Sequence, residues 1–187
     1  FKKRVKAFKS IESITNSMSY NIVVMAIKPQ IAQRILKIIS SIKFKNNVLF
    51  ISVLAGKKIS FFNTYLPKQN QLVRVMPNMP ALIEEGMSCM ICNKYVNKKN
   101  KNLATSLFLK LGKIIWLKNE LQINKVTAIS GSGPGYVFLF IDAFEKAALK
   151  LKLNEAEAKK LVHQTVLGSI KLLIQGSETA DDLANKI

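Results

Sequence analysis

The sequence lacks the features that would place it in a membrane or outside the cell. None of its apolar runs approaches the ~18 residues that a membrane-spanning helix requires. The chain also does not open with a charged stretch followed by an apolar segment, as a secretory signal peptide does. We therefore expect a cytoplasmic protein with no membrane partner. Because the first residue is Phe1 rather than methionine, we expect a processed chain or part of a longer reading frame.

Cysteine and histidine are scarce, which argues against a metal or redox centre. Cys89 and Cys92 form a C-x-x-C pair, and the single histidine, His163, lies far away on a predicted helix. Such a pair can form a redox centre or half of a metal site. The segment around it has the pattern of a strand, however, and residues three apart on a strand point to opposite faces. We therefore interpret both cysteines as buried free thiols and expect no metal site.

Acidic residues are also few, since 11 Asp and Glu stand against 29 Lys and Arg for a formal net charge of +18. By itself this excess suggests nucleic acid or another anionic surface as a partner. Most lysines are scattered singly, apart from groups within residues 2–9 and 94–101. Nucleic-acid-binding proteins concentrate their charge and interleave it with aromatics. We interpret the excess as biased composition on solvated faces and do not expect nucleic acid as a partner.

Hydrophobic residues make up 49% of the chain, which excludes global disorder. Up to about residue 119 they form continuous runs of strand length, typical of parallel strands covered on both faces, alternating with helical patterns. We expect strands over residues 21–27, 48–53, 72–76, 87–93 and 114–117, and helices over 11–17, 31–40 and 99–111, the last one ended by Gly112. The pattern predicts an α/β domain over 1–119, an incomplete doubly wound, Rossmann-like parallel sheet.

Residues 120–187 have only helical periodicity and predict a truncated all-α domain. A long helix is expected over about 123–150. A second helix comes next, capped by Asn154 with Glu157 at the capping-box position. A short third helix begins after about residue 177.

Three glycines and two serines lie within residues 130–135, inside the first of these helices. Each glycine costs roughly 1 kcal/mol relative to alanine in a helix, so a compensating role is expected. Without a Cβ, a backbone can closely approach another backbone or an anionic ligand. By composition alone a plain loop is an equal alternative.

Three segments together resemble pyrroline-5-carboxylate reductases. Thr127, the 130–134 core, Tyr136 and residues 138–143 are similar to the signature of that family. The segment 74–82 resembles its strand-end motif, although Met79 stands where threonine is usual. Ala26-Ile27-Lys28-Pro29-Gln30 resembles its cofactor-side turn, and the three segments occur in the order of the family. The resemblance covers about residues 9–187.

The resemblance implies an oxidoreductase of proline biosynthesis that reduces 1-pyrroline-5-carboxylate to proline, with NADP or NAD as cofactor. Because the cofactor supplies the hydride and the protonated imine is already electrophilic, positioning matters more than acid–base catalysis. No side chain is therefore assigned a catalytic role. We also expect a homo-oligomer, because the apolar residues Val137, Leu139, Phe140, Phe144 and Leu161 exceed what a small helical domain can cover.

The resemblance also implies which residues bind the cofactor. They lie in three turns at strand ends, and they are Ala26, Ile27, Lys28, Pro29, Ala55, Gly56 and Asn78. Ordinary strand-end turn chemistry is the alternative explanation of the same residues. Ser13 stands where the family has an asparagine near the adenosine phosphate, which weakens a preference for NADP over NAD.

For the substrate, the resemblance implies contacts from Glu120, Thr127 and Glu178. The alternative for both glutamates is a carboxylate at a helix start, favoured by the helix dipole. The segment implied to let helices of two subunits pack closely is Ser130, Gly131, Ser132, Gly133 and Pro134. The next position, Gly135, replaces the usual alanine.

Two motifs of the family do not occur in the sequence. It contains no G-x-G-x-x-G, and no Ser-Pro-Gly-Gly-Thr-Thr loop comes after the helical region. The resemblance thus implies an interior portion of the enzyme, and we expect the 187 residues alone to be inactive. The alternative is a decayed or split gene product that acts at most as a non-catalytic dimerising remnant.

Overall fold

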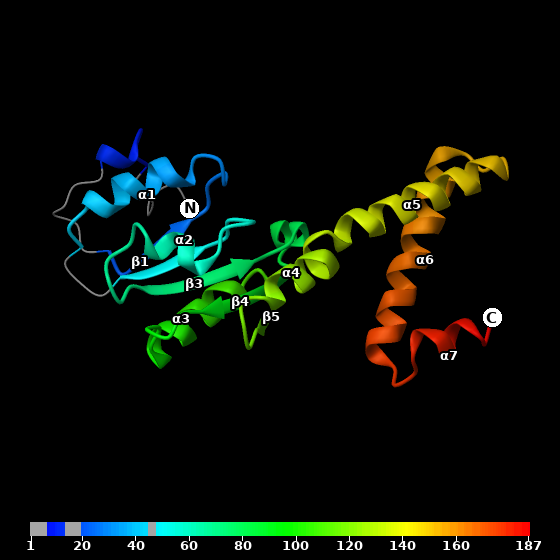
Figure 1. The fold of residues 1–187 in the computed structure, drawn as a ribbon. Helices are drawn as coiled ribbons and strands as arrows, with labels where there is room; N and C mark the ends of the chain where they lie inside the picture. The colour runs from blue at the N-terminus through cyan, green and yellow to red at the C-terminus, as the bar shows by residue number, and fades with distance from the viewer. Residues whose placement is uncertain (1–6, 14–19, 45–47) are drawn as a thin grey trace. The chain divides into compact units, whose positions relative to one another are not determined.

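The computed structural model describes residues 7–13, 20–44 and 48–187. The chain divides into two compact units, Phe1–Ser132 and Gly133–Ile187 (Figure 1). The first unit includes the start of the helical region, so this division lies later in the chain than the domain boundary predicted at residues 119 and 120. The helix predicted over 11–17 lies partly outside the described residues, and its described part is the 3-10 turn η1 (Ile11–Ser13).

The first unit is built on a five-stranded sheet with strand order β1-β2-β3-β4-β5. The strands are β1 (Ile22–Met25), β2 (Leu49–Ser52), β3 (Gln71–Met76), β4 (Gly86–Cys92) and β5 (Gly112–Trp116). Strands β1 to β3 are parallel, and β5 is parallel to β4. The predicted α/β fold is confirmed, with a mostly parallel sheet.

The expectation of an entirely parallel sheet is wrong at one pair, because β4 runs antiparallel to β3. Only residues 77–85, including the 3-10 helix η2 (Met79–Ile83), connect the two strands. A parallel crossover needs a connection of about a dozen residues or more. The chain therefore returns directly beside β3.

Helices cover both faces of this sheet, as the doubly wound pattern predicts (Figure 1). In β2, Phe50 joins a core cluster with α1 (Ala32–Ser41), whereas its neighbour Ile51 joins a second cluster with α3 (Lys98–Leu109). This division results from the alternation of side chains along a strand. A short helix that the sequence pattern did not predict, α2 (Ile59–Asn63), adds the fully buried Phe62 to the first cluster.

Gly112 does not end a helix, contrary to the prediction. Helix α3 ends at Leu109, and Gly112 is the first residue of β5, with a φ of +128°. A Cβ at this position would lie 2.1 Å from the carbonyl oxygen of Gly86. Glycine is required here because the two strand ends meet backbone to backbone.

The second unit consists of α5 (Gly133–Lys150), α6 (Glu155–Gln175) and α7 (Ala180–Ala184). The predicted capping box of α6 is confirmed. The side chain of Asn154 accepts a hydrogen bond from the Glu157 N–H at 2.9 Å, and the Glu157 carboxylate accepts one from the Asn154 N–H at 3.1 Å. An equivalent box formed by Thr179 and Asp182 begins α7.

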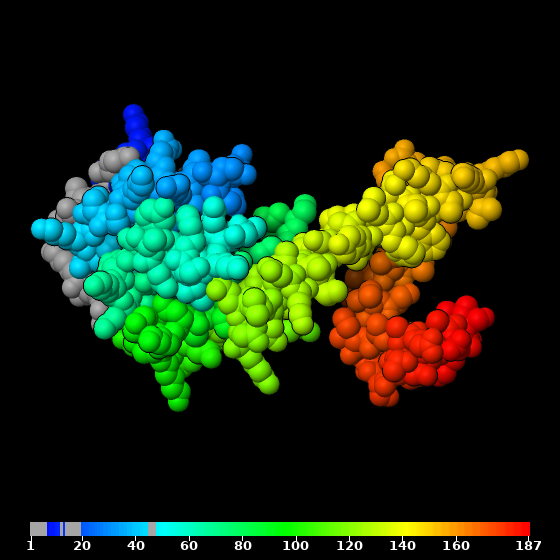
Figure 2. Space-filling model, viewed as in Figure 1, coloured from blue at the N-terminus to red at the C-terminus, as the bar shows by residue number. Residues whose placement is uncertain are grey.

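This unit has a small core and a large apolar surface. Within residues 133–187, all of which the structure describes, the buried hydrophobic residues are Ala148, Ala158 and Val162. Figure 2 shows the surface of this unit, coloured from yellow to red. Exposed large apolar side chains of the two helices include Val137, Phe138, Leu139, Phe140, Phe144, Leu161, Ile170, Leu172 and Ile174. Apolar surface of this extent is typical of an interaction face.

The described residues contain no group of three or more His, Cys, Asp or Glu that could hold a metal ion. Both cysteines are free thiols, as predicted; Cys89 is buried, whereas Cys92, the last residue of β4, is only half-buried. None of the described helices has the length and apolar character needed to span a lipid bilayer.

Candidate functional site

The turns that come after β1, β2 and β3 lie at one edge of the sheet. The three strands are parallel, with Met25 paired to Ser52 and Ser52 paired to Arg74. Their carboxyl ends therefore face the same side. In open α/β sheets this edge is where ligands bind.

The residues predicted to bind a cofactor all lie in these turns. Ala26–Pro29 connect β1 to α1, and the carbonyl oxygen of Lys28 accepts a hydrogen bond from the Ile31 N–H at 3.2 Å. Ala55 and Gly56 form the turn after β2, where both are exposed and Gly56 has a left-handed φ of +72°. The fold thus brings residues 26–29 and 55–56 to the same edge as Asn78.

Asn78, in the third turn, is half-buried and links three segments. Its side-chain oxygen accepts a hydrogen bond from the Met87 N–H at 2.8 Å. Its side-chain amide donates to the carbonyl oxygen of Ser130 at 3.1 Å. Through these two hydrogen bonds, Asn78 connects the end of β3 to β4 and to the glycine-rich helical segment.

The glycine-rich segment is helical, which excludes the plain-loop alternative. Helix α4 (Gln122–Val126) is followed by η3 (Thr127–Gly131), which is a turn of π-helix. The Thr127 hydroxyl donates to the carbonyl oxygen of Ile123 at 2.6 Å, and the Ser130 hydroxyl donates to that of Val126 at 2.9 Å. Such bonds to the preceding turn bend helices. π-Helical turns are rare and frequently occur at functional sites.

Gly131 lies against the end of β3. A Cβ at Gly131 would lie 3.2 Å from the Met76 Cε and 3.2 Å from the Thr127 Cγ2. Both contacts are to side chains, so a close approach of Gly131 to another backbone stays a prediction. Ser132 is exposed, and Gly133 and Pro134 begin α5, where proline is tolerated because the first N–H groups of a helix have no partner. Packing of this segment against a second subunit stays a prediction.

The carboxylate of Glu120, a predicted substrate contact, is engaged by two donors. Its Oε1 accepts a hydrogen bond from the Arg74 Nη1 at 2.8 Å and another from the Ile59 N–H at 2.7 Å. Arg74 lies on β3 and is only 4% exposed. No role was predicted for Arg74, although a basic residue within an apolar strand signals a buried ion pair.

Glu178, the remaining predicted substrate residue, precedes α7 in the second unit. Its carboxylate forms an ion pair with Lys186, and both side chains are exposed. A role of Glu178 toward the substrate stays a prediction.

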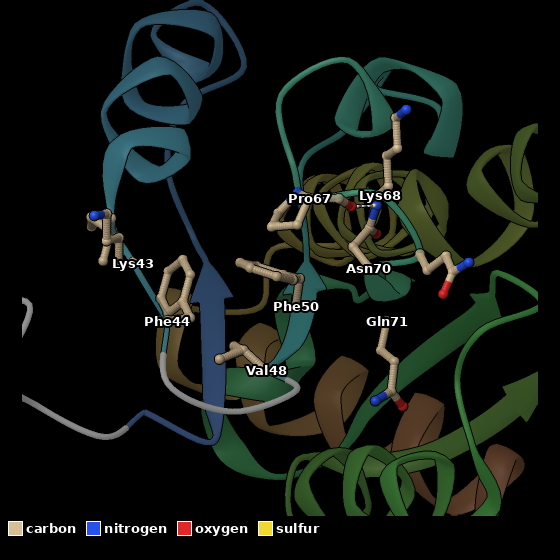
Figure 3. A pocket seen from close by; sticks show the side chains of 10 residues that line it. Lys43, Phe44, Val48, Phe50, Pro67, Lys68, Asn70 and Gln71 are labelled. Atoms are coloured by element: carbon tan, nitrogen blue, oxygen red, sulfur yellow. Dashed lines mark hydrogen bonds between the residues drawn. The ribbon is translucent and has the colours of Figure 1, made fainter.

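Cavities of the first unit lie at both edges of the sheet. One, of about 380 Å³, lies at the amino ends of β2 and β3, the edge opposite the three turns, and Figure 3 shows Phe44, Phe50, Pro67 and Gln71 around it. It contains none of the predicted site residues. Another, of about 320 Å³, adjoins the π-helical turn and is lined by Met87, Cys89, Ile115, Lys125, Val126, Ile129 and Ser130.

Comparison with known proteins identifies the relatives of this chain. Residues 120–187 match a family model described as pyrroline-5-carboxylate reductase dimerisation. Over 171 residues the chain is 33% identical to the pyrroline-5-carboxylate reductase of Haemophilus influenzae, covering 91% of this chain and 63% of that protein. The chain is a homologue of pyrroline-5-carboxylate reductases. The predicted resemblance is thus confirmed.

Solved reductase structures share the fold. The structure of a pyrroline-5-carboxylate reductase from Coxiella burnetii matches with a TM-score of 0.81 at 34% identity, covering 88% of this chain and 61% of that one. The Plasmodium falciparum reductase, solved with NADP bound, matches with a TM-score of 0.79 at 35% identity, covering 89% of this chain and 63% of that one. The chain spans 61–63% of the length of these three relatives.

Proposed function

We propose that the chain forms part of an NAD(P)H-dependent pyrroline-5-carboxylate reductase, an oxidoreductase that reduces 1-pyrroline-5-carboxylate to proline. The observation that carries the proposal is the meeting of three turns at the carboxyl edge of a Rossmann-like sheet, in a homologue of these reductases. A related structure with NADP bound supports the cofactor class. Because NAD(P)H is a cofactor of the cell interior, the proposal includes a cytoplasmic location.

In this proposal the turns containing Ala26–Pro29, Ala55–Gly56 and Asn78 contact NADP or NAD. The cofactor, when bound, supplies the hydride, and the chain orients it toward the substrate. Glu120, Thr127 and Glu178 contact the small-molecule substrate. The Thr127 hydroxyl already donates to Ile123, so its oxygen stays available to accept a hydrogen bond.

The proposal includes a second copy of the chain as partner. Support comes from the match of residues 120–187 to a dimerisation domain and from the exposed apolar residues of α5 and α6. Burial of this surface between two copies would supply the core that each unit lacks. The oligomer is therefore expected to form through residues 133–187.

A turnover assay tests the proposal. NADPH oxidation with 1-pyrroline-5-carboxylate is monitored for the 187-residue chain and for a chimera extended at both ends with the corresponding segments of the Haemophilus relative. We expect turnover by the chimera and none by the 187 residues, which contain no G-x-G-x-x-G. Gly56→Glu in the chimera, which places a negative charge at the second turn, should weaken binding of the anionic NADPH. A folded chimera without turnover would overturn the proposal.

The second candidate function is a non-catalytic dimerising remnant. The exposed apolar surface of the second unit favours it. This candidate predicts self-association without any nucleotide binding, whether or not the chain is extended. The chimera therefore distinguishes the two candidates.

A further inference from the structure

The first turn of α2 depends on a residue far away in the sequence. Ile59 is the first residue of α2, and the preceding Lys58 provides no side-chain cap. The first N–H groups of any helix lack partners within the helix. Here the Ile59 N–H donates to the carboxylate of Glu120, 61 residues later, at 2.7 Å. Glu120 therefore caps α2.

Helix α2 in turn continues from the Ala55–Gly56 turn. Only residues 57 and 58 separate the turn from the helix. The other anchor of α2 is Phe62, which is fully buried in the core. On its amino side the turn follows directly on Leu54, which is buried and whose N–H donates to the Ser52 hydroxyl at 3.2 Å. On its carboxyl side the turn is held through α2 and the cap at Ile59.

Arg74 fixes the capping carboxylate. Its guanidinium, on β3, lies 2.8 Å from the same Oε1 that accepts from Ile59. Arg74 is paired in the sheet with Ser52, the last residue of β2, from which the turn departs. Glu120 also begins the helical region, since its carbonyl oxygen accepts from the Ile123 N–H at 3.0 Å. One carboxylate thus joins β3, α2 and the start of α4.

We propose that Glu120, held by Arg74, is a positioning residue that sets the Ala55–Gly56 turn for the nucleotide. The inference rests on the proposed function for the identity of the ligand at this turn. The carboxylate is a suitable clamp because an ionised oxygen accepts stronger hydrogen bonds than a neutral one. Its side chain is only 27% exposed, and both donors occupy the same oxygen.

Hydrogen–deuterium exchange of the 187-residue chain tests the clamp without reference to activity. The variants are Glu120→Gln, which removes the charge, and Glu120→Asp, which keeps the charge but shortens the reach. Glu85→Gln, at an exposed position of the same unit, is the matched control. Circular dichroism first establishes that each variant is folded.

We expect amide exchange over residues 55–62 to become about tenfold faster in both Glu120 variants, as the loss of one charged hydrogen bond predicts. The Glu85→Gln chain should exchange like the wild type. Unchanged exchange over 55–62 in the folded variants would overturn the clamp.

Ligand titrations of the same substitutions in the extended chimera test the positioning role. Glu120→Gln should weaken NADPH binding about tenfold. Weakened proline binding with unchanged NADPH binding would overturn the inference in favour of a substrate contact. If the wild-type chimera binds no NADPH, the proposed function fails, whereas the exchange experiment still decides whether Glu120 holds the turn.

Discussion

Two glycines, one at the start of β5 and one in the turn after β2, occupy backbone positions that a larger residue would strain. Gly112 combines a φ of +128° with a Cβ position 2.1 Å from the Gly86 carbonyl oxygen. Gly56 also has a positive φ, +72°, but open space around it. The two glycines are therefore required for different reasons, and they form a matched pair for mutation.

Gly112→Ala should destabilise the chain by about 3 kcal/mol or more, because strained backbone and backbone overlap add up. Gly56→Ala should cost about 1–2 kcal/mol, the penalty of a left-handed residue alone. Urea denaturation of the two variants measures the difference. Equal losses for both variants would show that β4 and β5 can separate at little cost.

The positions of the three turns could be predicted from the sequence, because each comes after a continuous apolar run, and two of the turns lie within segments that resemble the reductase family. The partners of Glu120 could not. Its donors Arg74 and Ile59 are 46 and 61 positions away, and only the folded sheet brings them together. The buried charge of Arg74 was a signal that some carboxylate lies nearby, but not which one.

Among the elements, the strands and long helices agree with the sequence patterns, whereas short or locally ambiguous elements do not. Helix α2 has only five residues and takes its cap from a distant side chain. The π-helical turn depends on hydroxyl bonds to the preceding turn, which helical periodicity does not reveal. The connection between β3 and β4 is too short for a parallel crossover, and its length therefore sets the direction of β4. The sequence contains this signal, but the strand patterns alone do not reveal it.

Helix α7 supplies a pH-dependent element. Hydrogen bonds from the Thr179 side chain and backbone lower the pKa of Asp182 below its ordinary value of 3.8. Because the folded-state pKa is lowered, the stabilisation of the α7 start is present above pH 3.8 and is lost as the pH falls through the lowered pKa. NMR titration of the Asp182 carboxyl should give a midpoint below 3.8.

The Thr179→Ala variant provides the control for this titration. It removes the hydroxyl of the capping box, so the pKa of Asp182 should move back toward its ordinary value. A wild-type midpoint at or above the ordinary value would contradict the capping geometry at α7.

At the scale of the whole molecule, the chain combines a sheet unit with a substantial core and a helical unit with very little. The sheet unit buries residues on both faces of its strands. The helical unit, Gly133–Ile187, buries only small side chains and Val162. We propose a second copy of the chain as its partner, because residues 120–187 match a family model described as pyrroline-5-carboxylate reductase dimerisation.

Sedimentation velocity tests self-association. The wild-type chain should be a dimer or larger at micromolar concentration. Leu139→Glu, at a side chain that is 69% exposed on α5, should shift it toward monomer because an interface would bury an unpaired charge. Lys160→Glu, at an exposed polar position of α6, is the control and should leave the oligomeric state unchanged. A wild-type monomer with native helicity would contradict the proposed homo-oligomer.

The central functional claim is that a dinucleotide binds at the carboxyl edge of β1, β2 and β3. NMR mapping of backbone amides with millimolar NADP, and with pyrophosphate as the control ligand, tests it directly. We predict that NADP perturbs residues 26–29, 55–56 and 78 most strongly, and leaves the cavity around Phe44 and Gln71 at the opposite edge unchanged. Perturbation centred on that cavity, or none at the three turns, would contradict the claim.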